Sequence, residues 1–302
     1  MVDFVLVVVA PGQGAQTPGF LTPWLELPGL ADRLAAWSEV AELDLIAFGT
    51  TADADAIRDT AVAQPLLVAA ALASAEALGV APDLLAGHSV GEFATAALAG
   101  VITPEQALTL VRERGRAMAE AASVTETGMT AVLGGDEGDV LAVIDKHGLT
   151  PANINGSGQI VAGGTLEQLA AFADDGPPGA RLRPLAVAGA FHTAHMAPAV
   201  ERLREAAAQV TPADPGVRLL SNADGQVVTG GAEVMRRLVD QVSNPVRWDS
   251  CMATMAELGV TRMIELLPGG TLTGLARRGL RGVKTVAVKT PDDLDAAREL
   301  IK

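Results

Sequence analysis

One short motif of the sequence has the form of an activated serine. Gly87-His-Ser-Val-Gly91 fits the pattern Gly-x-Ser-x-Gly, in which a serine sits on a tight turn between a strand and a helix. The preceding apolar run, residues 84–86, favours a strand, and residues 92–98 favour a helix. We therefore predict that Ser89 is a nucleophile and that the Val90 N–H, at the start of the helix, donates to an oxyanion beside it.

A serine nucleophile needs a base, and the histidines of the chain are few: His88, His147, His192 and His195. His88 adjoins Ser89, so its side chain should diverge from the serine on the turn. His147 lies near the end of a predicted surface helix, where a solvated histidine is the simpler interpretation. His192 is the predicted base, because it lies where the chain crosses between two predicted domains and a cleft forms. His195 is expected to begin a helix and face solvent.

The loop after the first apolar run could bind either a phosphate or an oxyanion. Residues 4–9 predict a buried parallel strand, and Pro11-Gly-Gln-Gly14 follows it. A dinucleotide-binding loop would need a glycine where Thr17 stands. We therefore expect this loop to face the serine turn and to contribute a second oxyanion N–H. A non-catalytic nucleotide-binding module is the alternative from another class of function.

A basic segment, Arg112-Glu-Arg-Gly-Arg116, falls in the next predicted helix. Gly115 is unfavourable inside a helix by about 1 kcal/mol relative to alanine, which suggests close packing around Arg114. A guanidinium held near the serine would select a substrate carboxylate through a bidentate pair. Arg112 and Arg116 are expected to form a solvated face instead.

The elements that must position these residues fall into two groups. Strands and helices alternate in the outer parts of the chain, which predicts an α/β domain with a mostly parallel sheet. Between about residues 128 and 187 the order is instead strand, helix, strand, strand, helix, strand, the βαββαβ pattern of ferredoxin-like domains. We therefore predict a discontinuous core domain, residues 1–126 and 189–302, with a ferredoxin-like insert at residues 127–188.

The composition excludes several classes of function. The 302 residues include 22 Lys and Arg against 36 Asp and Glu, a net charge of −14 that disfavours binding to nucleic acid. The single cysteine, Cys251, excludes an internal disulfide framework and a multi-cysteine metal site. The first apolar run is too short to span a membrane, and residues 65–75 are expected to form a buried helix. We expect a soluble, cytoplasmic monomer.

Six motifs in one order give the sequence a family resemblance. They are Pro11-Gly-Gln-Gly-Ala-Gln16, Gly87-His-Ser-Val-Gly-Glu92, Arg114-Gly115, Ala190-Phe-His-Thr193, Asn244-Pro-Val-Arg-Trp248 and Pro268-Gly-Gly270. Over essentially its whole length the chain resembles the malonyl-CoA:acyl carrier protein transacylases, the acyltransferases of fatty-acid and polyketide synthesis. The resemblance implies a hydrolase-like α/β core with a ferredoxin-like insert, which agrees with the layout predicted above.

The resemblance also implies a role for each matching residue. Ser89 is similar to the serine that carries the acyl group, and His192 to its base. Gln13 and Val90 match the positions whose backbone N–H groups form the oxyanion hole. Arg114 matches the arginine that pairs with the malonyl carboxylate.

Four further positions follow from the resemblance. A backbone carbonyl after the Asn-Pro motif orients the histidine in this family, and here it would belong to Arg247. Asn153 and Asn155 resemble asparagines near the site. Phe191 resembles the bulky residue of malonyl-selective members, which leaves little room for an α-methyl group.

These residues together predict a transfer of malonyl in two steps, from coenzyme A to Ser89 and then to the phosphopantetheine thiol of an acyl carrier protein. Malonyl-CoA and the carrier protein are the expected partners, without nucleic acid or membrane, and no metal or other cofactor is expected. A serine thioesterase or hydrolase, in which water takes the second step, is the alternative with the same chemistry. The motifs fit a fatty-acid carrier and a polyketide carrier equally well.

Both coenzyme A and carrier proteins are negatively charged, so an acidic enzyme needs a local basic surface to attract them. The carboxyl-terminal part of this acid-rich chain contains five basic residues close together in sequence, which we expect to surround the mouth of the cleft: Arg277, Arg278, Arg281, Lys284 and Lys289.

Overall fold

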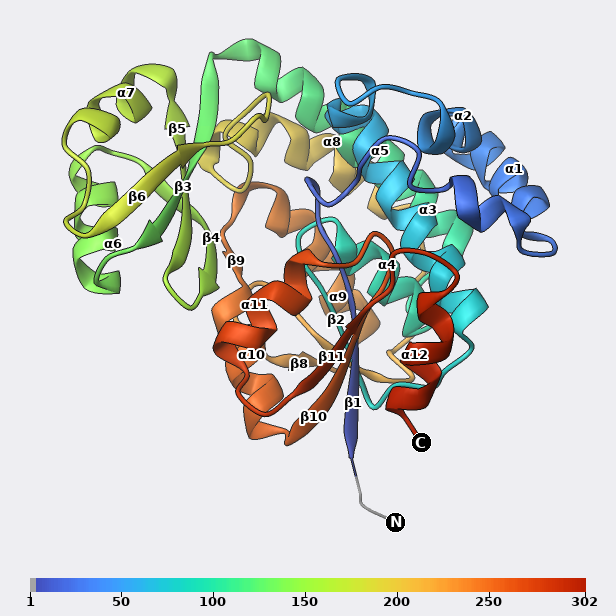
Figure 1. The fold of residues 1–302 in the computed structure, drawn as a ribbon. Helices are drawn as coiled ribbons and strands as arrows, with labels where there is room; N and C mark the ends of the chain where they lie inside the picture. The colour runs from blue at the N-terminus through green and yellow to red at the C-terminus, as the bar shows by residue number, and fades with distance from the viewer. Residues whose placement is uncertain (1–3) are drawn as a thin grey trace.

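Six strands form the larger sheet of the protein, in a computed structural model that describes residues 4–302. Their order is β11-β10-β1-β2-β7-β8, and every neighbouring pair is parallel except β7 and β8. The mostly parallel sheet predicted from the sequence is therefore confirmed, with β1 inside it (Figure 1). The strands are β1 Val5–Ala10, β2 Leu84–Gly87, β7 Arg218–Leu220, β8 Val227–Val228, β10 Val260–Glu265 and β11 Lys284–Ala287.

Helices cover both faces of this sheet, because successive side chains of a strand point to opposite sides. Leu6 and Val8 pack in a core with α3, α4 and α5, whereas Val7 and Val9 pack on α10 and α11. The 19-residue α3 is apolar enough to cross a membrane, but most of it is buried inside the protein, as predicted for its central part. The helices outside the insert are α1 Leu30–Ala41, α2 Leu45–Thr50, α3 Thr60–Leu78, α4 Gly91–Leu98, α5 Pro104–Val124, α8 Ala197–Ala207, α9 Gly231–Asp240, α10 Trp248–Glu257, α11 Thr271–Gly279 and α12 Asp293–Leu300, with short 3₁₀ helices η1 Thr22–Glu26, η2 Ala56–Arg58, η3 Ala194–Met196 and η4 Gln241–Ser243.

The segment between α5 and η3 forms a second sheet beside the first (Figure 1). Its strands pair antiparallel in the order β6-β3-β5-β4. A two-residue strand from the carboxyl-terminal part, β9 Val246–Arg247, extends this sheet by pairing with β4. The predicted βαββαβ order is present, and the elements are β3 Thr127–Gly134, α6 Glu137–Lys146, β4 Thr150–Gly156, β5 Gln159–Thr165, α7 Leu166–Asp174 and β6 Ala180–Pro184.

The sequence misplaced or missed several elements. The last strand of the insert was expected over residues 181–187, but β6 ends at Pro184, and the Leu185 N–H adds one further bond, to the Met129 carbonyl at 2.9 Å. The segment 185–188 is largely exposed instead. The terminal helix α12 and the short strands β8 and β9 were not predicted, since elements this short carry little periodic signal.

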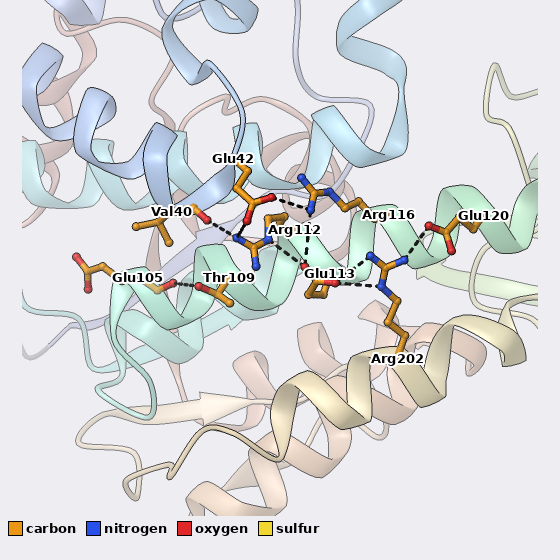
Figure 2. Close-up of polar contacts among 9 residues, drawn as sticks. All are labelled: Val40, Glu42, Glu105, Thr109, Arg112, Glu113, Arg116, Glu120 and Arg202. Atoms are coloured by element: carbon orange, nitrogen blue, oxygen red, sulfur yellow. Dashed lines mark hydrogen bonds and ion pairs between the residues drawn. The ribbon is translucent and has the colours of Figure 1, made fainter.

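An ion-pair network joins α1, α5 and α8 over the sheet (Figure 2). Arg112 Nη1 lies 2.8 Å from Glu42 Oε1, and Arg116 reaches the same carboxylate at 3.0 Å. Glu113 accepts from both Arg112 and Arg202, each at 3.0 Å. The Arg112 side chain is 18% exposed, so the expectation of a solvated basic face on α5 is wrong, because carboxylates of α5 and of the end of α1 pair with it.

Candidate active site

The predicted strand and helix around Ser89 are β2 and α4, and the turn between them has strained backbone geometry. Ser89 has φ 53°, in the left-handed region that non-glycine residues rarely adopt. A Cβ atom on Gly87 would lie 2.1 Å from the Glu92 backbone nitrogen, and one on Gly91 would lie 2.3 Å from the Ala10 carbonyl oxygen. The two glycines of the motif are therefore required for the helix to start this close to the strand.

Two side chains hold the serine in this conformation. The Ser89 N–H donates to Asn222 Oδ1 at 2.8 Å, and Asn222 Nδ2 donates to the Gly87 carbonyl at 2.7 Å. Gln241 Nε2 donates to the Ser89 carbonyl at 3.0 Å. These bonds offset the strain of the turn, which is typically about 1–3 kcal/mol for such a backbone.

The Ser89 hydroxyl points at His192, as the sequence predicted for a nucleophile and its base. Ser89 Oγ lies 2.7 Å from His192 Nε2, and His192 Nδ1 lies 2.8 Å from the Gln241 carbonyl oxygen. A carbonyl oxygen only accepts, so Nδ1 carries the proton and Nε2 is free to accept from the serine. Burial, followed by the positive charge of Arg114, lowers the pKa of His192 to about 3. The imidazole is therefore neutral at pH 7.

The carbonyl that orients His192 belongs to Gln241, and the expectation that Arg247 supplies it is wrong. Gln241 begins η4, directly after α9, and its carbonyl faces the histidine before the chain reaches the Asn-Pro motif. Arg247 lies farther along in β9, where its N–H donates to the Asn222 carbonyl and its guanidinium pairs with Asp249 at 2.7 Å.

Arg114 lies on α5 with its guanidinium inside the protein, 1% exposed. Nη1 donates to Gln64 Oε1 at 2.7 Å and Nη2 donates to Gln241 Oε1 at 2.8 Å, while Nε has no partner among residues 4–302. Burial lowers the pKa of Arg114 to about 10, against the opposing field of Glu92, so the group stays charged at pH 7. The close packing predicted at Gly115 is confirmed, because a Cβ there would lie 2.9 Å from the Thr60 carbonyl.

A cavity of about 100 Å³ brings most of the predicted residues together. This is roughly the space of three water molecules, which suits a small acyl group. Seven predicted residues line the cavity: Gln13, Ser89, Val90, Arg114, Asn153, Phe191 and His192. The other lining residues are Gln64, His88 and four apolar side chains of α5 and the insert, Met118, Met129, Leu185 and Val187.

The remaining predicted residues lie outside this cavity. Asn155 Oδ1 lies 2.9 Å from Nε2 of His88, whose ring is turned toward the insert and away from the Ser89 hydroxyl, as expected. His147 ends α6, and its ring packs on Phe172, so the side chain is 13% exposed and not solvated as expected. His195 is half-buried in the short η3 before α8.

The Gly12–Gly14 loop lies against the serine turn, since a Cβ on Gly12 would lie 2.9 Å from the His88 carbonyl oxygen. Val90 is the N-cap of α4, where backbone N–H groups lack helical acceptors. Across the described residues 4–302, no protein acceptor takes the backbone N–H of Val90 or of Gln13. Both residues line the cavity that Ser89 faces, and a backbone N–H without a protein acceptor can donate to an oxyanion.

None of the five basic residues expected at the mouth lines the cavity itself. All are exposed, and none pairs with a carboxylate within residues 4–302. Strands β11, β10, β1 and β2 are parallel, and Ser89 follows the carboxyl end of β2. Lys284 begins β11, so it lies at the amino-terminal end of this strand, the end of the sheet opposite to Ser89. Arg277, Arg278 and Arg281 come just before it in the chain. Lys289 follows the carboxyl end of β11, the end at which Ser89 lies.

Four polar residues of the site were not predicted: Gln64, Glu92, Asn222 and Gln241. Glu92 is 5% exposed and accepts the Asn222 N–H at 2.7 Å and a hydrogen bond from Gln241 Nε2. Burial raises the pKa of Glu92 to about 7, although Asn222, Gln241 and Arg114 act in the opposite direction. Asn222 follows a core strand, the position where functional residues of parallel sheets gather. No signal in the sequence marks Gln241.

Comparisons with known proteins place the chain in a family. The acyl transferase domain family matches residues 7–292. The malonyl CoA-acyl carrier protein transacylase of Mycobacterium tuberculosis (strain H37Rv) is 52% identical, over 98% of this chain and the whole of that one. The crystal structure of MCAT from Mycobacterium tuberculosis superposes with a TM-score of 0.94, covering 97% of this chain and 99% of that chain at 52% identity. A type II PKS malonyl-transacylase, PlMCAT, in complex with its acyl-carrier protein AntF superposes with a TM-score of 0.91 at 31% identity, covering 98% and 99%. The chain therefore belongs to the acyl transferase family, among its malonyl CoA-acyl carrier protein transacylases.

Proposed function

We propose that the protein moves a malonyl group from coenzyme A to the phosphopantetheine thiol of an acyl carrier protein. The observation that carries this proposal is the pairing of two chemical features in one small cavity. The Ser89–His192 pair supplies a nucleophile with its base, and Arg114 supplies a buried cation whose Nε–H has no acceptor among residues 4–302. Such a cavity suits an acyl group that ends in a carboxylate. The name of the Mycobacterium tuberculosis relative and the carrier complex of the PKS enzyme support the same substrate and partner.

The first step forms the acyl-enzyme. His192 Nε2 takes the Ser89 proton, and Oγ attacks the thioester carbonyl carbon. The N–H groups of Gln13 and Val90 stabilise the resulting oxyanion. The carbon–sulfur bond then breaks, and the departing thiolate of coenzyme A takes the proton from His192, which leaves a malonyl ester on Ser89.

The second step reverses these roles. The carrier thiol gives its proton to His192, and its sulfur attacks the ester carbonyl. The bond to Ser89 Oγ breaks, and the oxygen recovers the proton. A malonyl carboxylate paired with Arg114 offsets the positive charge that disfavours imidazolium, so binding of the correct acyl group makes His192 a better base. No step requires a metal or another cofactor.

We also propose the architecture and the setting of this activity. The core domain of residues 1–126 and 189–302 is hydrolase-like, and the insert of residues 127–188 is ferredoxin-like, with β9 of the core added to its sheet. The enzyme acts as a cytoplasmic monomer on a carrier of fatty-acid or polyketide synthesis. Among the basic residues, Lys289 is best placed to meet the carrier, because it lies at the carboxyl end of the core strands.

The proposal is tested by intact mass measurement after mixing the protein with malonyl-CoA, with and without carrier protein. We expect a malonyl adduct that is lost in Ser89→Ala, kept in the surface control Ser123→Ala, and discharged by the carrier faster than by water. Rapid discharge by water alone would indicate a hydrolase, and the absence of any adduct would contradict both. Lys289→Glu should raise the carrier KM, with Lys284→Glu as the matched control at the other end of β11.

A further inference from the structure

We propose that Glu92 is a positioning residue, which fixes the orientation of the Gln241 side-chain amide and thereby aims Arg114 at the carboxylate of the acyl group. The inference deepens the proposed function and rests on it. Glu92 lies in the first turn of α4, three residues after Ser89, and its side chain is buried. It lines no part of the acyl cavity, so it acts through its neighbours.

The hydrogen bonds around Glu92 have a defined direction. An ionised carboxylate only accepts hydrogen bonds, so Gln241 must turn its NH₂ group toward Glu92. The opposite end of the same amide, Oε1, then faces Arg114 and accepts from Nη2 at 2.8 Å. With this orientation Nε2 also donates to the Ser89 carbonyl at 3.0 Å. The Glu92 carboxylate and the Ser89 carbonyl together thus set which end of the amide meets the guanidinium.

The charges around Arg114 support the same role for Glu92. Arg114 is almost fully buried, and its direct hydrogen-bond partners are the neutral amides of Gln64 and Gln241. Glu92, one hydrogen bond farther on, provides the negative charge that opposes the burial of this cation. Among residues 4–302, Nε of Arg114 has no hydrogen-bond partner. The guanidinium is therefore held from two sides at the wall of the cavity, with hydrogen-bonding capacity left for a substrate carboxylate.

A purely structural role makes a different prediction for Glu92→Gln. If Glu92 only accepted the Asn222 N–H, a glutamine would replace it well, because its Oε1 accepts equally. A positioning role predicts a conflict, since two NH₂ groups would face each other at residues 92 and 241. The Gln241 amide would rotate to relieve the conflict, and its NH₂ group would then face the Arg114 donors. Arg114 would lose an acceptor and its orientation.

The experiment compares Ser89 acylation by malonyl-CoA and by acetyl-CoA, which lacks the carboxylate. In Glu92→Gln we expect kcat/KM for malonyl-CoA to fall by about 10- to 100-fold, the range for a lost hydrogen bond to a charged group. Acetyl transfer should fall much less, because only the malonyl carboxylate needs Arg114, so the malonyl-to-acetyl ratio falls. The malonyl-to-acetyl ratio is independent of the fraction of folded enzyme. Glu265→Gln is the matched control, a buried acid that caps α11 outside the cavity and should leave the ratio unchanged.

A second variant keeps the test decisive. Gln241→Met keeps the backbone carbonyl for His192 and removes the amide between Glu92 and Arg114, so it should lower the malonyl-to-acetyl ratio in the same direction even if Glu92→Gln does not fold. Equal losses for both substrates or an unchanged ratio would overturn the inference. If the wild type forms no malonyl adduct, the proposed function itself fails, and the inference with it.

Discussion

Replacing Arg114 tests the proposed carboxylate site most directly, and Arg114→Met is the informative change. Methionine has similar length and no charge, so it removes the guanidinium without leaving a large void. Removing one partner of a buried, hydrogen-bonded ion pair costs about 3–5 kcal/mol. At 1.36 kcal/mol for each factor of ten, kcat/KM for malonyl-CoA should fall by roughly 150- to 5,000-fold.

The same change should spare or improve acetyl transfer. An acetyl group has a hydrogen where malonyl has its carboxylate, so in the wild type an acetyl group leaves the buried cation of Arg114 unpaired. Arg114→Met also leaves the Oε1 atoms of Gln64 and Gln241 without their donor, which lowers the stability of the fold. The readout must therefore be independent of how much enzyme is folded.

A competition assay meets this requirement. Equal concentrations of malonyl-CoA and acetyl-CoA compete for Ser89, and intact mass gives the ratio of the two adducts within each sample. Arg116→Met is the matched control, because Arg116 lies on the same helix but pairs with Glu42 outside the cavity. If Arg114→Met keeps the malonyl-to-acetyl ratio within threefold of the wild type, Arg114 does not bind the carboxylate.

Three further outcomes follow from the geometry. The pKa of buried His192 lies far below its usual value of 6.5, so the unfolded chain binds this proton first and the folded state loses stability as the pH falls below 6.5. In urea unfolding, the free energy of unfolding of the wild type should therefore fall by about 2 kcal/mol more than that of His192→Gln between pH 7 and pH 5. An equal pH dependence of the two proteins would contradict the buried neutral imidazole. Gly115→Ala should destabilise the fold by about 1–3 kcal/mol, because its Cβ would lie 2.9 Å from the Thr60 carbonyl. The control Gly274→Ala in α11 meets open space and should stabilise the fold by about 0.5–1 kcal/mol. If Gly115→Ala is as stable as the wild type in the same unfolding measurement, the packing argument is refuted. Phe191→Ala should enlarge the cavity and raise acylation of Ser89 by methylmalonyl-CoA relative to malonyl-CoA, and an unchanged ratio in the competition assay would show that Phe191 does not limit the acyl group.

The residues found from the sequence carry a local signal. Ser89 lies between two glycines at fixed spacing after an apolar run, and the backbone of the turn requires both glycines. His192 emerged because the chain has few histidines and this one lies at a predicted domain crossing. Arg114 was indicated by the unfavourable Gly115 beside it. Each of these features is visible within a few residues of the chain.

The residues missed by the sequence act through contacts between distant segments. Gln241 lies 152 residues from Ser89, whose carbonyl it binds, and Asn222 lies 133 residues away. The error at Arg247 has the same origin. Every residue has a carbonyl, so only the path of the chain after α9 decides which one meets His192. The pairing of β9 with the insert is likewise a tertiary contact made by only two residues.

The choice of a carbonyl to orient His192 has an electrostatic reason in a cavity that must accept a negative acyl group. A carboxylate against Nδ1 would place another negative charge beside the malonyl carboxylate, and both would compete for Arg114. The Gln241 carbonyl orients the imidazole without a net charge. The acid that does balance the buried cation, Glu92, is set behind the Gln241 amide and away from the cavity.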